Sequence, residues 1–186
     1  MVFDVPSRWI RVCAFQTLLL IAITEATNRT TAAHPAGAVG EQVRSTDPAI
    51  RALIAEAASL SRTFRRLVET IEGTNGIVYV ESGTCGHGVR ACMKMNVTPA
   101  GDYRILRILI DLRRKPRELM GSIGHELRHA IEVLENRKLV DDSTVYLFYA
   151  AGGSGGSNGQ PFETSAAIEA GFAVRNEIES SFNGTR

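Results

Sequence analysis

Apolar positions three and four residues apart predict most of the helices of this chain. The first helix begins at Asp47 and Pro48, because Asp caps helices and Pro is accepted in their first turn. Apolar residues then recur without a break up to Ile71, so this stretch is predicted as one helix that ends at Gly73 or Gly76. Further helices are predicted over about 116–137, 143–150 and 164–180.

Strands are predicted between the first and second helices. Residues 77–80 are a short β-branched run, and 90–97 and 103–112 follow as two more strands. The turn residues at 99–102 join the last two, which predicts an antiparallel hairpin. A helix, a small sheet and then further helices indicate an α+β fold. The glycine-rich segment 152–159 is interpreted as a linker in preference to a lid.

Composition favours one folded domain. The chain has 186 residues, of which 44% are hydrophobic and 22% charged, enough to build a core and too balanced for low-complexity disorder. Its formal net charge of +1 gives no bulk electrostatic reason to expect a nucleic-acid partner.

The first 38 residues have the features of a secretory signal peptide. Arg8 and Arg11 precede an apolar run over 12–23, and small residues follow it. Glu25 ends the run short of the roughly 20 residues that a membrane span needs. Cleavage within 26–38 would leave one domain over 39–186, secreted or periplasmic and without a stable membrane span. The alternative is an amphipathic or buried N-terminal helix.

Two cysteines remain after removal of this segment. Cys85 and Cys92 are an even number in an oxidising compartment, and the residues between them include glycines that favour a turn. We therefore expect a Cys85–Cys92 disulfide. A metal site made of both cysteines and His87 is the alternative, although it has only three ligands at an unfamiliar spacing.

One motif in the 116–137 helix carries chemistry. His125-Glu126-Leu127-Arg128-His129 has the pattern H-E-x-x-H. Two histidines four residues apart share a helix face, so both imidazoles can reach one zinc ion. Glu126 is rotated about 100° from His125 and can approach a metal-activated water as a general base.

This motif resembles that of the zincin metallopeptidases. The longer phrase over 125–133 also looks like a group of exported bacterial proteins with the pattern HELxHAxEV. Further similarities to that group lie at 63–67, 78–80 and 162–167. The resemblance implies a zincin-like fold, in which a small antiparallel sheet packs with the motif helix and two or three further helices. It also implies an edge strand along the cleft, which we expect near 103–112, and a downstream Glu as the third zinc ligand.

No histidine follows His129, so an acid must complete any zinc site. Glu163 lies at the start of the last helix, on a face with small residues that allow two helices to approach closely. Glu169 and other acids remain alternatives, although Glu169 points about 120° away from Glu163. Glu132 lies about 10 Å along the helix axis from His125 and fits better as a hydrogen-bond acceptor that holds His129.

These observations together predict an exported zinc hydrolase, which the resemblance narrows to a metallopeptidase of peptide or protein substrates. His125, His129 and Glu163 would hold Zn²⁺, and Glu126 would act as the general base. A non-catalytic zincin-like binding module is the alternative, and a metal-free structural domain is a third. Tyr146 and Tyr149 are candidates for stabilising a developing oxyanion, but such tyrosines are more often packing residues.

Overall fold

The computed structural model describes residues 41–86, 88–152 and 162–183, which fall in one compact unit. The proposed signal peptide (1–38), His87 and most of the glycine-rich segment lie outside these residues. Within the described part, five strands form one mixed sheet of order β1-β2-β5-β3, with β4 also paired to β5. The strands are β1 (Val43–Arg44), β2 (Gly76–Ser82), β3 (Ala91–Met93), β4 (Thr98–Ala100) and β5 (Tyr103–Ile110).

The predicted hairpin is confirmed, but the prediction of an antiparallel sheet is wrong. β3 and β4 run antiparallel to β5, whereas β1, β2 and β5 are mutually parallel. β2 and β5 are parallel because the chain reverses its direction twice between them, once after β2 and again before β5. β5 is therefore an inner strand, and the expectation of an edge strand near 103–112 is also wrong. The sheet edge on that side is β3.

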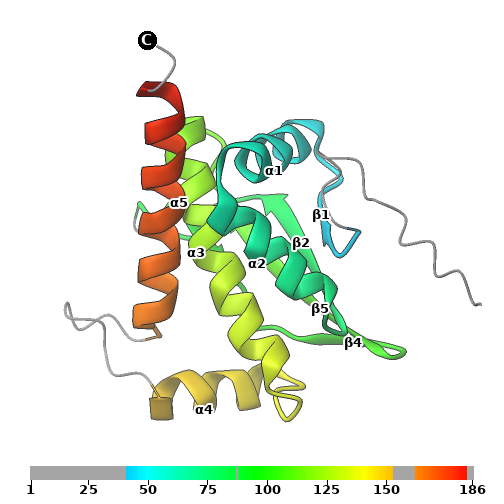
Figure 1. Ribbon diagram of the computed structural model, residues 1–186. Helices are drawn as coiled ribbons and strands as arrows, with labels where there is room; N and C mark the ends of the chain where they lie inside the picture. The colour runs from blue at the N-terminus through cyan, green and yellow to red at the C-terminus, as the bar shows by residue number, and fades with distance from the viewer. Residues whose placement is uncertain (1–40, 87, 153–161, 184–186) are drawn as a thin grey trace, which may run out of the picture. The chain divides into compact units, whose positions relative to one another are not determined.

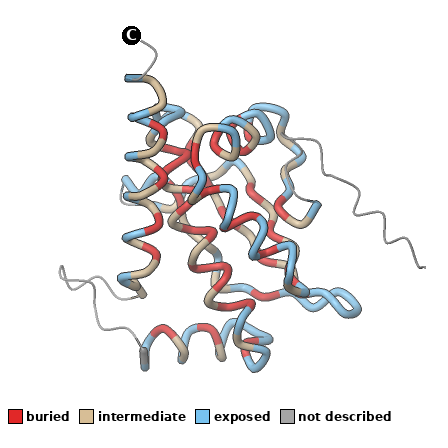
Figure 2. The backbone as a smooth tube through the Cα atoms, viewed as in Figure 1, coloured by how far each residue is buried: buried red, intermediate tan, exposed pale blue. Residues whose placement is uncertain are grey.

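Three helices lie against the sheet: α1 (Pro48–Leu60), α2 (Arg62–Glu72) and α3 (Pro116–Glu135) (Figure 1). The described residues form two more helices, α4 (Asp142–Gly152) and α5 (Ser165–Asn183). α3 lies between α5 and the sheet and contacts α1, α2, β3 and β5 as well. Figure 2 shows buried positions gathered where these elements meet, with alternate residues of β2 and β5 among them. The H-E-x-x-H helix is thus the central helix of the fold.

The single helix expected over 48–72 is two helices in the structure, α1 and α2. The described residues therefore form four helices besides α3, where two or three were expected. Ser61 separates them, with an extended backbone at φ −119° and ψ 120°. Its Oγ caps α2 by accepting a hydrogen bond from Phe64 N at 2.9 Å, and it donates to Glu177 on α5 at 2.6 Å. The apolar spacing continues across the break because both helices bury the same side, so the pattern alone did not reveal it.

A buried arginine fixes the end of α3 against the sheet. Arg104 on β5 is only 6% exposed and donates hydrogen bonds to carbonyl groups at the C-terminal end of α3. The last carbonyls of an α-helix lack the usual partners four residues on, so a cation here supplies further donors to them and suits the negative end of the helix dipole. Arg104 shares the buried face of β5 with Leu106, Ile108 and Ile110, and its hydrogen bonds explain how a charge is accommodated there.

Glycines bring α3 and α5 into close contact. A Cβ at Gly124 would lie 2.8 Å from Val174 Cγ2, and one at Gly171 would lie 3.0 Å from His125 Cβ. Side chains at either position would therefore push the helices apart. The expected small-residue face of α5 is present, with Ala167 and Ala170 buried. Among the described residues, every helix is too short or too polar to span a membrane.

Candidate metal and catalytic site

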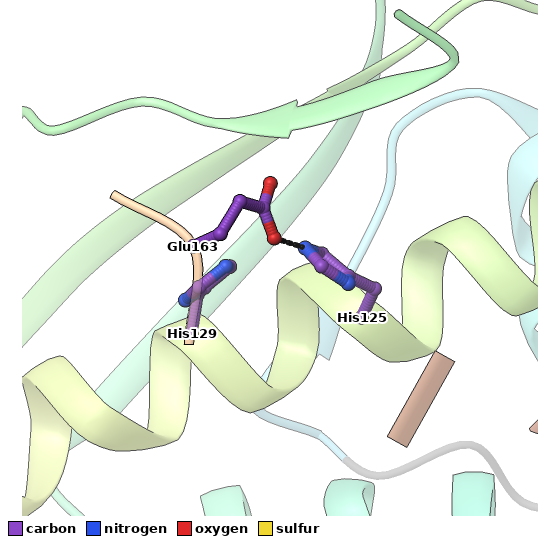
Figure 3. A group of neighbouring side chains, drawn as sticks. All are labelled: His125, His129 and Glu163. Carbon is purple, nitrogen blue, oxygen red and sulfur yellow. Dashed lines mark ion pairs between the residues drawn. The ribbon is translucent and has the colours of Figure 1, made fainter. Parts of the chain in front are cut away.

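His125 and His129 project from the same side of α3, one turn apart (Figure 3). Their ring centroids are 4.8 Å apart, and their side chains are 19% and 7% exposed. The helical spacing of the motif therefore produces the shared face that the sequence predicts. Because both rings are largely shielded from water, their orientations are held by packing.

The segment that precedes α5 brings Glu163 to the two histidines (Figure 3). Thr164 starts α5 as its cap: its Oγ1 accepts a hydrogen bond from Ala167 N, and its carbonyl accepts one from Ile168 N, both at 3.1 Å. Glu163 lies immediately before this cap, and its Oε2 is 3.1 Å from His125 Nε2. One ligand atom from each of His125, His129 and Glu163 lies within 4.8 Å of the others.

This group is suited to a metal ion because of the state of the Glu163 carboxylate. Its Oε2 atom is buried and has no hydrogen-bond partner, since the contact with His125 lacks hydrogen-bond geometry. A buried carboxylate oxygen without a donor is costly, and a cation beside it would remove that cost. Two imidazoles and one carboxylate are also a common protein ligand set for catalytic zinc. Glu169, the alternative acid, is exposed and lies outside the group.

Glu132 supports the site from behind. Its Oε2 lies 3.0 Å from His129 Nδ1, the contact that the sequence predicts, so Nε2 is the ring atom left to face the group. Its Oε1 accepts a 2.7 Å hydrogen bond from Thr164 Oγ1, the cap of α5. Burial would raise the pKa of Glu132, but hydrogen bonds from His129 and Thr164 outweigh burial and lower it. One ionised carboxylate therefore links a ligand histidine to the segment that carries Glu163.

Tyr149 on α4 completes this support. Its hydroxyl is directed at the His129 carbonyl oxygen at 3.1 Å and at Glu132 Oε2 at 3.3 Å. Burial, followed by the charge of Glu132, raises the pKa of Tyr149, so the phenol stays a neutral donor. Its hydroxyl is engaged in holding the motif helix, whereas Tyr146 is 53% exposed. The packing interpretation therefore fits Tyr149 better than a role beside an oxyanion.

Glu126 lies on the adjoining face of α3 and is directed at the sheet edge. It is 7% exposed, and its Oε2 accepts a 2.7 Å hydrogen bond from the backbone N–H of Met93 in β3. Burial raises the pKa of this carboxyl, although the two histidines and the Met93 N–H act in the opposite direction. For His125, burial alone would lower the pKa, but the Glu163 and Glu126 carboxylates outweigh burial and raise it.

The site opens into a pocket of ≈ 690 Å³. One wall is the segment 88–91, the floor is α3 with His125 and Glu126, and the other wall is α5 with the preceding Glu163. Cys85 and Cys92 form a disulfide that closes the loop carrying residues 88–91. The bonded sulfurs do not provide the thiolates that the alternative metal site requires, and His87 lies outside the described residues. The disulfide thus helps to shape one side of the pocket.

The edge strand β3 lies beside the pocket. On either side of β3, Lys94 N donates a hydrogen bond to the Arg107 carbonyl, and the Arg90 carbonyl accepts one from Asp111 N. Residues 90 and 94 therefore direct these backbone groups toward β5. The backbone groups of Ala91 and Met93 therefore face away from the sheet. Met93 N–H is taken by Glu126, whereas Ala91 lines the pocket.

Sequence reasoning missed the contacts that Thr164 and Tyr149 make with Glu132. Thr164 and Tyr149 both hold Glu132, but they come from separate elements, so no local spacing relates them to the motif. A Thr before a helical run is a signal for a cap, yet its second bond to Glu132 depends on the tertiary fold. Comparison of the chain with protein-family models, with curated proteins and with solved structures found no match.

Proposed function

We propose that this chain is an exported zinc-dependent hydrolase that acts on peptides or proteins. The observation that carries the proposal is the buried Glu163 Oε2, which has no hydrogen bond and lies beside the two histidines of a helical H-E-x-x-H motif. Export rests on the sequence of residues 1–38. The peptide class rests on the resemblance to zincins and on the edge strand beside the pocket.

His125, His129 and Glu163 would hold the zinc ion. Bound zinc would act as a Lewis acid that polarises a carbonyl and makes water a better nucleophile. Glu126 lies one residue from His125 and projects toward the same pocket, where it would take a proton from the attacking water. The Met93 N–H keeps one carboxylate oxygen of Glu126 in place, which leaves the other for this transfer.

The edge of β3 would orient the substrate. An extended peptide that lies along this edge would meet the outward backbone groups of Ala91, which lines the pocket next to Glu126. Backbone hydrogen bonds of this kind hold a peptide without regard to its side chains. The scissile carbonyl would then lie between β3 and α3, within reach of the ligand group.

Replacing Glu126 with Gln tests the assignment of the general base. Gln has nearly the same shape and still accepts the Met93 hydrogen bond, but it takes up no proton. We expect hydrolysis of a peptide library to fall by about 10²–10⁴-fold, as for loss of other general bases, while zinc content is unchanged. Glu135→Gln, an exposed position on the same helix, is the matched control and should keep full activity.

Full hydrolysis by Glu126→Gln would refute the mechanism. Stoichiometric zinc in the unsubstituted chain without any cleavage would favour the binding-module alternative. Absence of zinc, together with stability that a chelator does not change, would favour a structural domain.

A further inference from the structure

Arg175 on α5 lies in the wall of the pocket and has no partner among the residues that the structure describes. Its Nε atom is buried and makes no hydrogen bond, and no carboxylate of the described chain forms an ion pair with it. Arg90 lines the same pocket but is paired with Glu118 at 3.1 Å. Neither acid of the pocket pairs with Arg175: Glu126 accepts the Met93 N–H, and Glu163 Oε2 lies 3.1 Å from His125 Nε2.

Two independent contacts locate Arg175 relative to the histidines. A Cβ on Gly121 of α3 would lie 3.3 Å from Arg175 Cβ and 3.5 Å from its Nε. Gly121 precedes His125 by four residues, a rise of about 6 Å along the helix. On α5, Gly171 contacts His125 and precedes Arg175 by four residues, which gives the same rise of about 6 Å. Arg175 therefore lies one helical turn from the level of the ligand group.

The wall of the pocket between these points is apolar. Ile168 and Phe172 lie one turn apart on the face of α5 that ends at Arg175, and all three line the pocket. Phe172 is 58% exposed, and Val89 in the pocket wall is 48% exposed. An apolar surface beside an unpaired guanidinium suits a ligand that carries an apolar side chain and a carboxylate, since guanidinium binds carboxylate through two parallel hydrogen bonds.

We propose that Arg175 is a specificity-determining residue that binds a carboxylate of the substrate, with Ile168 and Phe172 contacting an adjacent apolar side chain. This inference rests on the proposed peptidase function. Arg175 lies about 6 Å along the helix axis from the level of His125, and an extended residue spans about 3.3–3.6 Å, so the carboxylate would lie a few residues from the bond that is cleaved. The carboxylate has two sources in peptides: the C-terminus and the side chains of Asp and Glu.

Peptide binding without cleavage tests the proposal. The full chain with Glu126→Gln is loaded with zinc and titrated calorimetrically with N-acetylated tri- and tetrapeptides of Leu and Ala. Each peptide is used as a free acid and as a C-terminal amide, which tests the C-terminal carboxylate. A second set of amides carries either Glu or Gln at one internal position, which tests a side-chain carboxylate. We expect at least one carboxylate form to bind about 10–100-fold more tightly than its uncharged counterpart, as for a hydrogen bond to a charged group.

Substitution of Arg175 then assigns the preference. Arg175→Gln should bind acid and amide equally, and Arg175→Lys should keep part of the preference for the carboxylate. The control is Arg66→Gln, which removes the same charge at an exposed position outside the pocket and should keep the whole preference. Thermal denaturation checks that each variant is folded. Three results would overturn the proposal. With Arg175 in place, the protein binds no peptide, or it binds acid and amide equally. With Arg175→Gln, the folded protein keeps an unchanged preference for the carboxylate.

The peptidase function is tested separately by cleavage. A carboxylate preference that depends on Arg175, seen in a protein that cleaves no peptide when Glu126 is intact, would support the carboxylate site and refute the peptidase.

Discussion

At the scale of single residues, Glu132 connects the parts of the site. Its two oxygens contact His129, Thr164 and Tyr149, which belong to α3, the start of α5 and α4. A carboxylate that accepts from Nδ1 fixes the orientation of an imidazole and makes its other nitrogen a stronger ligand. The same carboxylate also holds the cap next to Glu163, so it acts on two of the three proposed ligands.

Glu132→Gln should therefore weaken zinc binding although Glu132 is not itself a proposed ligand. We expect the affinity to fall by about 10–100-fold, as for loss of other partners of metal-bound histidines. Competition with a chelator of known affinity measures the change. Glu135→Gln is the control on the same helix, and equal zinc affinity in the Glu132 variant would show that its contacts do not support the site.

At the scale of elements, Glu177 joins α5 to the junction of α1 and α2. Its carboxylate accepts hydrogen bonds from Ser61 Oγ at 2.6 Å and from Thr63 N and Oγ1, both at 2.9 Å. Burial alone would raise the pKa of Glu177, but these hydrogen bonds outweigh burial and lower it below its usual 4.5. The charged form of this residue therefore stabilises the contact between the helices.

The pH dependence of stability follows from this pKa. Because the folded-state pKa is lowered, the stabilisation is present above the unfolded-state value of about 4.3–4.5 and is lost as the pH falls through the folded-state pKa. The unsubstituted protein should be more stable than Glu177→Gln at pH 6, by about 1 kcal/mol given partial screening by solvent. This difference in the free energy of unfolding, from urea denaturation, should shrink as the pH falls below the unfolded-state value.

Glu179→Gln, an exposed position on the same helix, is the control and should follow the unsubstituted protein throughout. A difference between the Glu177 variant and the unsubstituted protein that stays constant from pH 6 to 3 would contradict this role of the charge.

At the scale of the whole molecule, sequence predicted the elements better than their pairing. The positions of α3, α5 and β5 follow from local periodicity, and so does the face shared by His125 and His129. Strand direction does not follow in this way, because it depends on how many times the chain reverses between strands that are distant in sequence. The break at Ser61 also escaped prediction, since its reason is a hydrogen bond to α5 more than a hundred residues later.

Packing between elements that are distant in sequence also determines which acid faces the two histidines. Glu163 and Glu169 are both downstream of the motif, and spacing alone left the two open. In the structure, the cap at Thr164 and its bond to Glu132 hold the start of α5 against α3, and this brings Glu163 to His125. Glu169 lies on an exposed face of α5.

Zinc binding by Glu163→Ala and by Glu169→Ala, each compared with the unsubstituted chain, tests whether Glu163 completes a zinc site with His125 and His129. Metal analysis and competition with a chelator should find a single tight zinc ion in the unsubstituted protein and in Glu169→Ala. Loss of the hydrogen-bond partner of a ligand lowers metal affinity by up to about 100-fold. Loss of the ligand itself in Glu163→Ala should lower zinc affinity by more than this. Equal zinc affinity in all three proteins, or no zinc binding in any of them, would refute a zinc site that Glu163 completes.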